Sequence, residues 1–284
     1  MLANVLHAIN GVDPQEIPYK PHPSFVGGKD RCLRATVYWR MGIPRTLADR
    51  AQSLSREHKA LRELTLRTIR EKSAYRLSCE NTRVSCGLVE FMGIKEYPLE
   101  ALIDGVLTDM MNRHYLLQIK PVVQKAFEKL LEGETCLEEL IKCCFLMKGA
   151  GLTQCVLLFK NKNTSAYLDF LLVYDGKADF LEILSASSSQ GGLITPLENQ
   201  FTGLYRAGIE WFEKVERFAI SSVLPPRSFT HTSWQCSYCS YGNLCRQDEG
   251  KSTNPLPMSW SSLVRRVSNG MSICSPGKSI DIGQ

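Results

Sequence analysis

Long apolar runs are absent from this sequence of 284 residues, although 44% of its residues are hydrophobic. No stretch approaches the roughly 18 consecutive apolar residues that a membrane-spanning helix needs. The opening residues, MLANVLHAINGVDPQ, also lack the basic start of a secretory signal. We therefore expect no transmembrane helix and a cytoplasmic location, or a nuclear one if the source cell has a nucleus.

Internal repeats and a strong charge of either sign are missing as well. The chain carries 34 Lys and Arg against 29 Asp and Glu, a net charge of +5. This mild basic excess suits an anionic partner such as DNA without requiring one. The length allows one large domain with a sizeable core, to which we assign residues 1–249. Residues 250–284 are rich in Ser, Asn, Pro and Gly, which predicts a flexible tail.

Helical and strand-like segments are mixed along the domain. Helical periodicity predicts helices over about 31–41, 53–72, 122–148 and 196–220. Runs of apolar, β-branched and aromatic residues predict strands within 74–86, 88–94, 99–108, 115–120, 155–162 and 166–175. This order favours an α/β fold in which a mixed central sheet is covered by helices.

Eleven cysteines are present, and in a reducing compartment they do not form a disulfide framework. Cys236, Cys239 and Cys245 follow a C-x2-C-x5-C spacing, which can direct three thiolates at one metal. We choose Cys32, on the first predicted helix, as a fourth ligand. Four thiolates suit either zinc or an iron-sulfur cluster, and cysteine is also a common buried residue. We interpret the other seven cysteines as core residues.

A second group of polar residues lies in LIDGVLTDMMNRHYLLQIKP, residues 102–121, which reads as a β-hairpin. Side chains alternate along a strand, so Gln118 and Lys120 share one face. A three-residue loop centred on Met111 would place Asp104 directly across from Gln118. A carboxylate, an amide oxygen and an ammonium group could then bind Mg2+ or Mn2+ and act on a phosphate. An ordinary surface hairpin would show the same pattern.

His58 lies on the apolar side of the predicted helix over 53–72, one turn after Leu54. A histidine in this position is more often a core residue than a metal ligand. If it is a ligand, its imidazole favours Mn2+ over Mg2+.

Taken in order, these motifs resemble the PD-(D/E)XK nuclease superfamily. They are most similar to the RecB-like exonucleases with an iron-sulfur cluster, the CRISPR-associated RecB-type family and its phage-encoded relatives. The resemblance spans residues 32–245. It implies a restriction-endonuclease-like fold, with a small cluster subdomain formed by residues 28–45 and 230–249. It also implies a DNA exonuclease that binds DNA ends or single strands, with other nucleic-acid-processing proteins as candidate partners.

The resemblance also implies a role for each residue of the two motifs. The catalytic residues would be Asp104, Gln118 and Lys120. The Mn2+ or Mg2+ ligands would be His58, Asp104, Gln118 and the Ile119 carbonyl, and a 4Fe-4S cluster would be held by Cys32, Cys236, Cys239 and Cys245. Glu80 resembles a glutamate that often precedes the catalytic strands, and we assign it no role. Candidate phosphate contacts are Arg31, Arg34, Arg40, Lys125 and Lys129.

Two departures from the family pattern matter for activity. The family has Glu or Asp where this chain has Gln118, and the lost negative charge weakens Mg2+ binding. Sites with Gln at this position do occur in the superfamily, so reduced activity is favoured over none. The family's Q-x3-Y pattern is missing, because Gln200 and Tyr205 are five residues apart. The alternatives are a DNA-binding or assembly subunit that has lost most hydrolysis, and a zinc-stabilised interaction protein.

Overall fold

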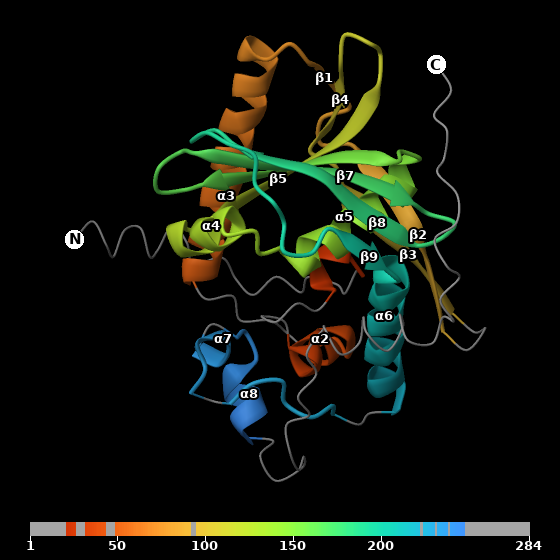
Figure 1. Cartoon of the computed structure of the whole chain (residues 1–284). Coiled ribbons are helices and arrows are strands. Elements are labelled where there is room, and N and C mark those ends of the chain that lie inside the picture. The colour runs from red at the N-terminus through yellow and green to blue at the C-terminus, as the bar shows by residue number, and fades with distance from the viewer. Residues whose placement is uncertain are drawn as a thin grey trace.

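The computed structural model has a mixed α/β architecture, as the sequence predicts (Figure 1). The structure describes residues 21–26, 32–43, 49–91, 95–221, 224–230, 232–237 and 239–247. The predicted tail over 250–284 lies outside the described residues, as do parts of both segments assigned to the cluster subdomain. None of the described helices is both long and apolar enough to cross a membrane.

A seven-stranded sheet forms the centre of the molecule, and the order of its strands is β1-β4-β5-β6-β7-β8-β9. Strands β5 and β6 pair in parallel, while the other neighbours in this sheet pair antiparallel. The strands are β1 (Arg76–Ser78), β4 (Gly105–Thr108), β5 (His114–Val122), β6 (Gln154–Asn161), β7 (Tyr167–Asp175), β8 (Phe180–Ser188) and β9 (Gln200–Thr202).

Helices cover the two faces of this sheet. Helix α5 (Leu137–Ala150) packs on one face, where Leu116 of β5 belongs to the main core. Helix α3 (Asp49–Lys72) lies on the other face, where its Leu66 joins Leu117 and Ile119 in a second apolar cluster. Because side chains alternate along β5, Gln118 and Lys120 point to the α5 side. The shared face predicted for these two residues is therefore confirmed.

The parallel pair β5 and β6 needs a crossover connection, which consists of α4 (Gln124–Leu131) followed by α5. Helix α5 is buried around most of its circumference, because a second sheet packs on its outer side. That sheet consists of β2 (Arg83–Phe91) and β3 (Lys95–Leu102). The helix approaches β2 so closely that a Cβ on Gly149 would lie 2.7 Å from the carbonyl oxygen of Ser85.

Several parts of the predicted secondary structure are wrong. The helix predicted over 122–148 is two helices, α4 and α5, and the strand predicted over 99–108 is divided between β3 and β4, which belong to different sheets. The helix predicted over 196–220 is α6 (Leu204–Ser221), because residues 200–202 instead form β9 and pair with β8. Strand β8 was not predicted. Its second half, SASS, is rich in small polar residues that favour loops, and pairing with β7 forms the strand despite them.

The short helices α2 (Leu33–Arg40), α7 (Trp234–Ser237) and α8 (Gly242–Gln247) form a group beside α6, away from the central sheet (Figure 1). Arg40 of α2 forms an ion pair with Glu216 of α6 at 2.6 Å. Tyr38, Trp39 and Tyr241 form an apolar cluster between α2 and the segment around α8. Residues near 38 and near 241, far apart in the sequence, therefore pack together.

Candidate active site

The β4–β5 hairpin has the register that the sequence predicts. Gly105 pairs with Leu117 and Thr108 with His114, which places Asp104 across from Gln118. Within the turn, the amide of Asp109 donates to the carbonyl of Arg113, so the loop beyond this hydrogen bond is centred on Met111. The Asp109 carboxylate accepts hydrogen bonds from the amides of Met111 and Arg113 and stabilises this turn. Local turn chemistry therefore fixes which residues meet at the other end of the hairpin.

Asp104 is 1% exposed and is surrounded by donors. Its Oδ2 accepts hydrogen bonds from the Ile119 amide at 2.6 Å and from Nε2 of Gln118 at 2.7 Å. Its Oδ1 forms an ion pair with Nη2 of Arg62 at 2.5 Å. Burial raises the pKa of Asp104, and the positive charge of Arg62 together with the Ile119 amide opposes that rise.

Gln118 is 3% exposed, and its Oε1 has no hydrogen-bond partner among the described residues. An amide oxygen left without a donor in the interior costs about 1–3 kcal/mol. Its Nε2 is directed at Asp104 by the 2.7 Å hydrogen bond. A buried carbonyl oxygen beside a carboxylate is a donor set that hard cations such as Mg2+ and Mn2+ prefer. The site therefore fits a divalent metal ion.

Lys120 and Glu139 form the second ion pair of the site, with Nζ donating to Oε1 at 2.5 Å. Lys120 is 38% exposed, whereas Glu139, in the first turn of α5, is buried. Sequence reasoning missed Glu139. The signal for it was the Glu138–Glu139 pair at the start of a helix that follows β5 in the chain.

His58 and Arg62 lie four residues apart on α3 and so share one face of the helix. Burial lowers the pKa of His58, and the positive charges of Lys162 and Lys120 lower it further. His58 is half-buried and near enough to Lys120 for an electrostatic interaction. Arg62, which sequence reasoning also missed, contacts Asp104. Among the residues that the structure describes, no three His, Cys, Asp or Glu side chains are grouped as metal ligands.

The four cysteines singled out in the sequence come from α2 and from the α7–α8 segment. Burial raises the pKa of Cys239, and the nearby Cys32, Cys236 and Cys245 thiols raise it further. All three are therefore close enough to interact electrostatically with Cys239. Zinc and iron-sulfur clusters use thiolate ligands. In the described residues these four thiols are not gathered closely enough to form a metal-binding group.

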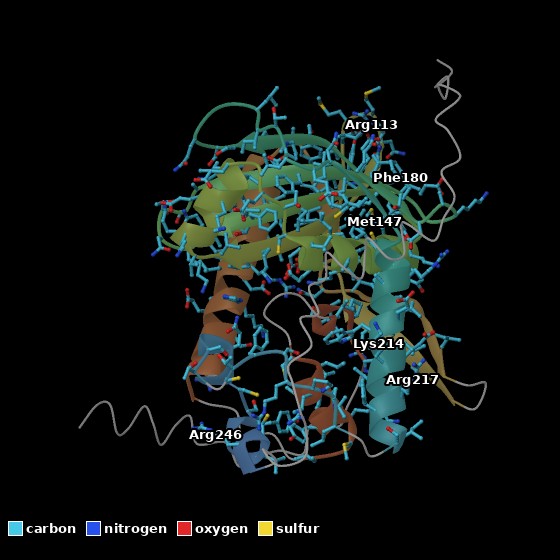
Figure 2. All side chains as sticks on the ribbon, turned by 60° about the horizontal axis from the view of Figure 1, so that its bottom comes forward. Arg113, Met147, Phe180, Lys214, Arg217 and Arg246 are labelled. Carbon is cyan, nitrogen blue, oxygen red and sulfur yellow. The ribbon has the colours of Figure 1, made fainter. Side chains whose placement is uncertain are left out.

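Arg34 of α2 is buried and connects this helix to the segments that follow α6. It is 1% exposed, its Nε donates to the Pro225 carbonyl at 2.8 Å, and its Nη1 contacts Sγ of Cys245 at 3.8 Å. Tyr241 Oη donates to the Ile43 carbonyl at 3.2 Å. In Figure 2, Arg246 of α8 lies at the opposite end of the view from Arg113 of the hairpin turn. The cysteine group is thus a separate region from the hairpin tip.

The expected phosphate contacts need correction. Arg34 is buried, Arg40 is bound to Glu216, and Lys129 forms an ion pair with Glu134 at 2.8 Å. Lys125 is exposed, and Arg31 lies outside the described residues. The sequence does not reveal which of its many basic residues are bound to acidic neighbours. Lys120 and Lys162 act electrostatically on His58, and each is also bound to an acidic neighbour, Lys120 to Glu139 and Lys162 to Glu57 at 3.3 Å.

The remaining cysteines are partly as expected. Cys86, Cys143, Cys144 and Cys155 are buried in the main core, in agreement with the sequence interpretation. Cys136 is half-buried and packs against the edge of this core, whereas Cys79 is exposed and is not a core residue. Cys274 lies outside the described residues. Cys79 lies in the turn between β1 and β2, where it has a positive φ of 52°.

Comparisons with known proteins add little to this description. No family model matches the chain, and no curated protein matches it. A solved structure described as "Crystal structure of SSO0001" aligns with a TM-score of 0.45 and 11% sequence identity, over 89% of this chain and 98% of that chain. A likeness of this size establishes neither a family nor an activity. The function is therefore inferred from the residues of the site.

Proposed function

We propose that this chain is a metal-dependent deoxyribonuclease with a restriction-endonuclease-like fold, acting as an exonuclease on DNA ends. One observation carries the proposal. The hairpin register brings Asp104 and Gln118 into contact, with the Gln118 Oε1 buried and lacking a hydrogen bond, while Lys120 lies two residues further along the same strand face. Carboxylate, amide oxygen and ammonium are the groups that metal-assisted phosphodiester hydrolysis needs.

The residues divide the work as follows. A bound Mn2+ or Mg2+ supplies polarisation of the phosphate and a bound water of lowered pKa. Asp104, the Gln118 oxygen, the Ile119 carbonyl and His58 would hold this ion. His58 is suited to this role, since its lowered pKa keeps the imidazole neutral and its lone pair available. Lys120 is partly exposed and orients the attacking water or offsets the charge that develops on the phosphate.

The four cysteines support a second part of the proposal, a structural 4Fe-4S cluster held by Cys32, Cys236, Cys239 and Cys245. The three other thiols all act on Cys239, and the group joins α2 to the α7–α8 segment. The cluster would fasten the two ends of the domain together. Zinc is the rival occupant for the same four thiols.

DNA is the proposed substrate, bound mainly through its phosphates. Lys120 and Lys162 both act electrostatically on His58 and offer positive charge near it. A phosphate would compete for them with Glu139 and with Glu57, which lies 3.3 Å from Lys162. Such a substrate agrees with the expected cytoplasmic or nuclear location.

The second candidate function is a DNA-binding or assembly subunit with little hydrolysis. The observation that favours it is that Arg62 and the Gln118 amide group already bind both oxygens of Asp104. A carboxylate satisfied in this way can stabilise the fold without any metal.

The test is degradation of end-labelled single-stranded and duplex DNA by the anaerobically purified chain with Mn2+. Lys120→Ala should abolish digestion. Lys177→Ala is the matched control, because it removes the same charge from the exposed β7–β8 turn, at the opposite end of the sheet from Lys120 by strand register. Digestion that is lost with Lys120→Ala and kept with Lys177→Ala supports the nuclease. DNA binding without digestion in the wild-type chain supports the assembly subunit.

A further inference from the structure

Glu139 is a buried carboxylate that has no role in the proposed metal site or in DNA binding. It lies in the first turn of α5 and accepts a hydrogen bond from Lys120 at 2.5 Å. Its neighbour Glu138, in the same turn, is only half-buried. Negative charge in the first turn of a helix interacts favourably with the helix dipole, and either residue provides that. Burial of Glu139 against the sheet therefore needs a further explanation.

Glu139 lies on the α5 side of β5, the side to which Gln118 and Lys120 point. Lys120 binds Glu139, while Gln118 binds the buried Asp104. Two buried carboxylates that repel each other cost free energy unless cations compensate them. Here Arg62 binds one and Lys120 binds the other. The site thus contains two acidic groups, although the strand position that carries the second carboxylate in the resembling family is Gln118.

A second observation points to a ligand at this place. The Gln118 Oε1 lies on a 3% exposed residue, on the same strand face as Lys120, and has no hydrogen-bond partner among the described residues. Gln118 contacts Asp104 through its Nε2, and the next residue on the same strand face is Lys120, which binds Glu139. One amide oxygen and two carboxylates form a set whose charge matches that of a divalent cation.

We propose that Glu139 supplies the second carboxylate of the metal site and replaces the charge that Gln118 lacks. The inference rests on the proposed function, since it assigns a ligand to the same metal. It implies that α5, and not only the β4–β5 hairpin, contributes to the site. Lys120 is partly exposed and can turn from Glu139 toward the substrate phosphate when the cation is bound.

The test is Mn2+ binding by the full-length chain, followed by the electron paramagnetic resonance signal of free Mn2+. Glu139→Gln should weaken Mn2+ binding at least tenfold. Glu138→Gln removes the same charge from the same helical turn and should change it less than about twofold, because Glu138 accepts a hydrogen bond from Cys136 whereas Lys120 of the site binds Glu139. Adding Gln118→Glu to Glu139→Gln should restore binding, because it returns the second carboxylate to the strand. Far-UV circular dichroism confirms that each variant is folded.

The outcomes separate the inference from the proposed function. Equal Mn2+ affinity in Glu139→Gln and Glu138→Gln overturns the role of Glu139, and digestion by the wild-type chain leaves the nuclease proposal intact in that case. Selective weakening by Glu139→Gln in a chain that digests no DNA supports Glu139 as a ligand and overturns the nuclease. A wild-type chain that binds no Mn2+ overturns both.

Discussion

Replacing Gln118 by glutamate tests the electrostatics of the site in the metal-free protein. The side-chain nitrogen of Gln118 lies 2.7 Å from the Asp104 Oδ2, and both residues are buried. Gln118→Glu exchanges this donor for a carboxylate oxygen of nearly the same shape. Two carboxylates at such a distance repel each other, so the variant should be destabilised without metal.

The size of the effect follows from two estimates. Two unit charges at the observed 2.7 Å repel by about 6 kcal/mol at an effective dielectric constant of about 20. The pair avoids this by taking up one proton, which costs about 1.4 kcal/mol for each pH unit above the ordinary glutamate pKa of about 4.3. Protonation is the smaller cost near neutrality. The destabilisation should therefore be about 4 kcal/mol at pH 7 and about 1 kcal/mol at pH 5.

The sign of the pH dependence is specific to this mechanism. The folded variant holds the shared proton at a pH where the unfolded chain has released it, so its folded pKa is raised. The variant is therefore not destabilised below the unfolded pKa, and its destabilisation grows as the pH rises from there toward the folded pKa. The shared proton also makes a hydrogen bond between the two carboxyl groups, in place of the one that Gln118 donates.

Urea unfolding between pH 5 and pH 8 measures the effect. The matched control is Gln200→Glu, because the exposed Gln200 side chain donates to Glu182 of the neighbouring strand at 3.2 Å. A new carboxylate there should cost less than about 1 kcal/mol, as like charges directly opposite on a strand pair do. Mn2+ should restore the stability of Gln118→Glu and leave that of Gln200→Glu unchanged. A loss of stability in Gln118→Glu that does not vary with pH would refute the reasoning.

Three further predictions concern other parts of the chain. The pKa of His58, followed by NMR, should lie below 6.5 because the imidazole is partly buried. The free energy of unfolding should then fall relative to that of His58→Gln as the pH drops through 6.5 toward the folded pKa, and a pKa at or above 6.5 contradicts the burial of the charge. Cys236→Ala should remove the brown colour and the absorbance near 400 nm of the anaerobic protein, while the exposed Cys79→Ala keeps them; a colourless wild type that contains zinc rejects the cluster. Gly208→Ala should lower the melting temperature, because the new Cβ would lie 2.3 Å from the buried Phe145 ring. This clash should outweigh the helix preference of alanine, about 1 kcal/mol, and an unchanged or higher melting temperature shows that α5 and α6 can separate.

The hairpin could be predicted from the sequence because its determinants are local. Alternation along β5 places Gln118 and Lys120 on one face, and the turn that fixes the register is stabilised by Asp109 within a few residues. Helix α6 shows the limit of such reasoning. The residues predicted as its first turns form β9 instead, because β8 offers them a pairing partner that local propensity does not include.

The partners of the site residues could not be predicted in the same way. Lys120 and Glu139 are 19 residues apart, and they meet only because α5 returns across the face of β5. Arg62 reaches Asp104 from α3, on a different element altogether. Helical periodicity indicates which side of α3 faces the sheet, but not which polar residue on that side meets a carboxylate. Motif reasoning therefore identified the hairpin residues and missed Arg62 and Glu139.

Arg62 and a divalent cation would compete for the carboxylate of Asp104, and the two candidate functions differ in which of them binds it. Its guanidinium is tethered to Asp104 by the fold, so it pays no translational entropy to bind, whereas a free cation does. A divalent cation carries twice the charge of the guanidinium and would also bind the Gln118 Oε1, which has no hydrogen bond when Arg62 binds Asp104. Arg62 is 27% exposed and can turn into solvent, while the 1% exposed Asp104 cannot. The buried oxygen of Gln118 therefore gives a divalent cation a contact that Arg62 does not make, and the two candidate functions differ in which cation binds Asp104.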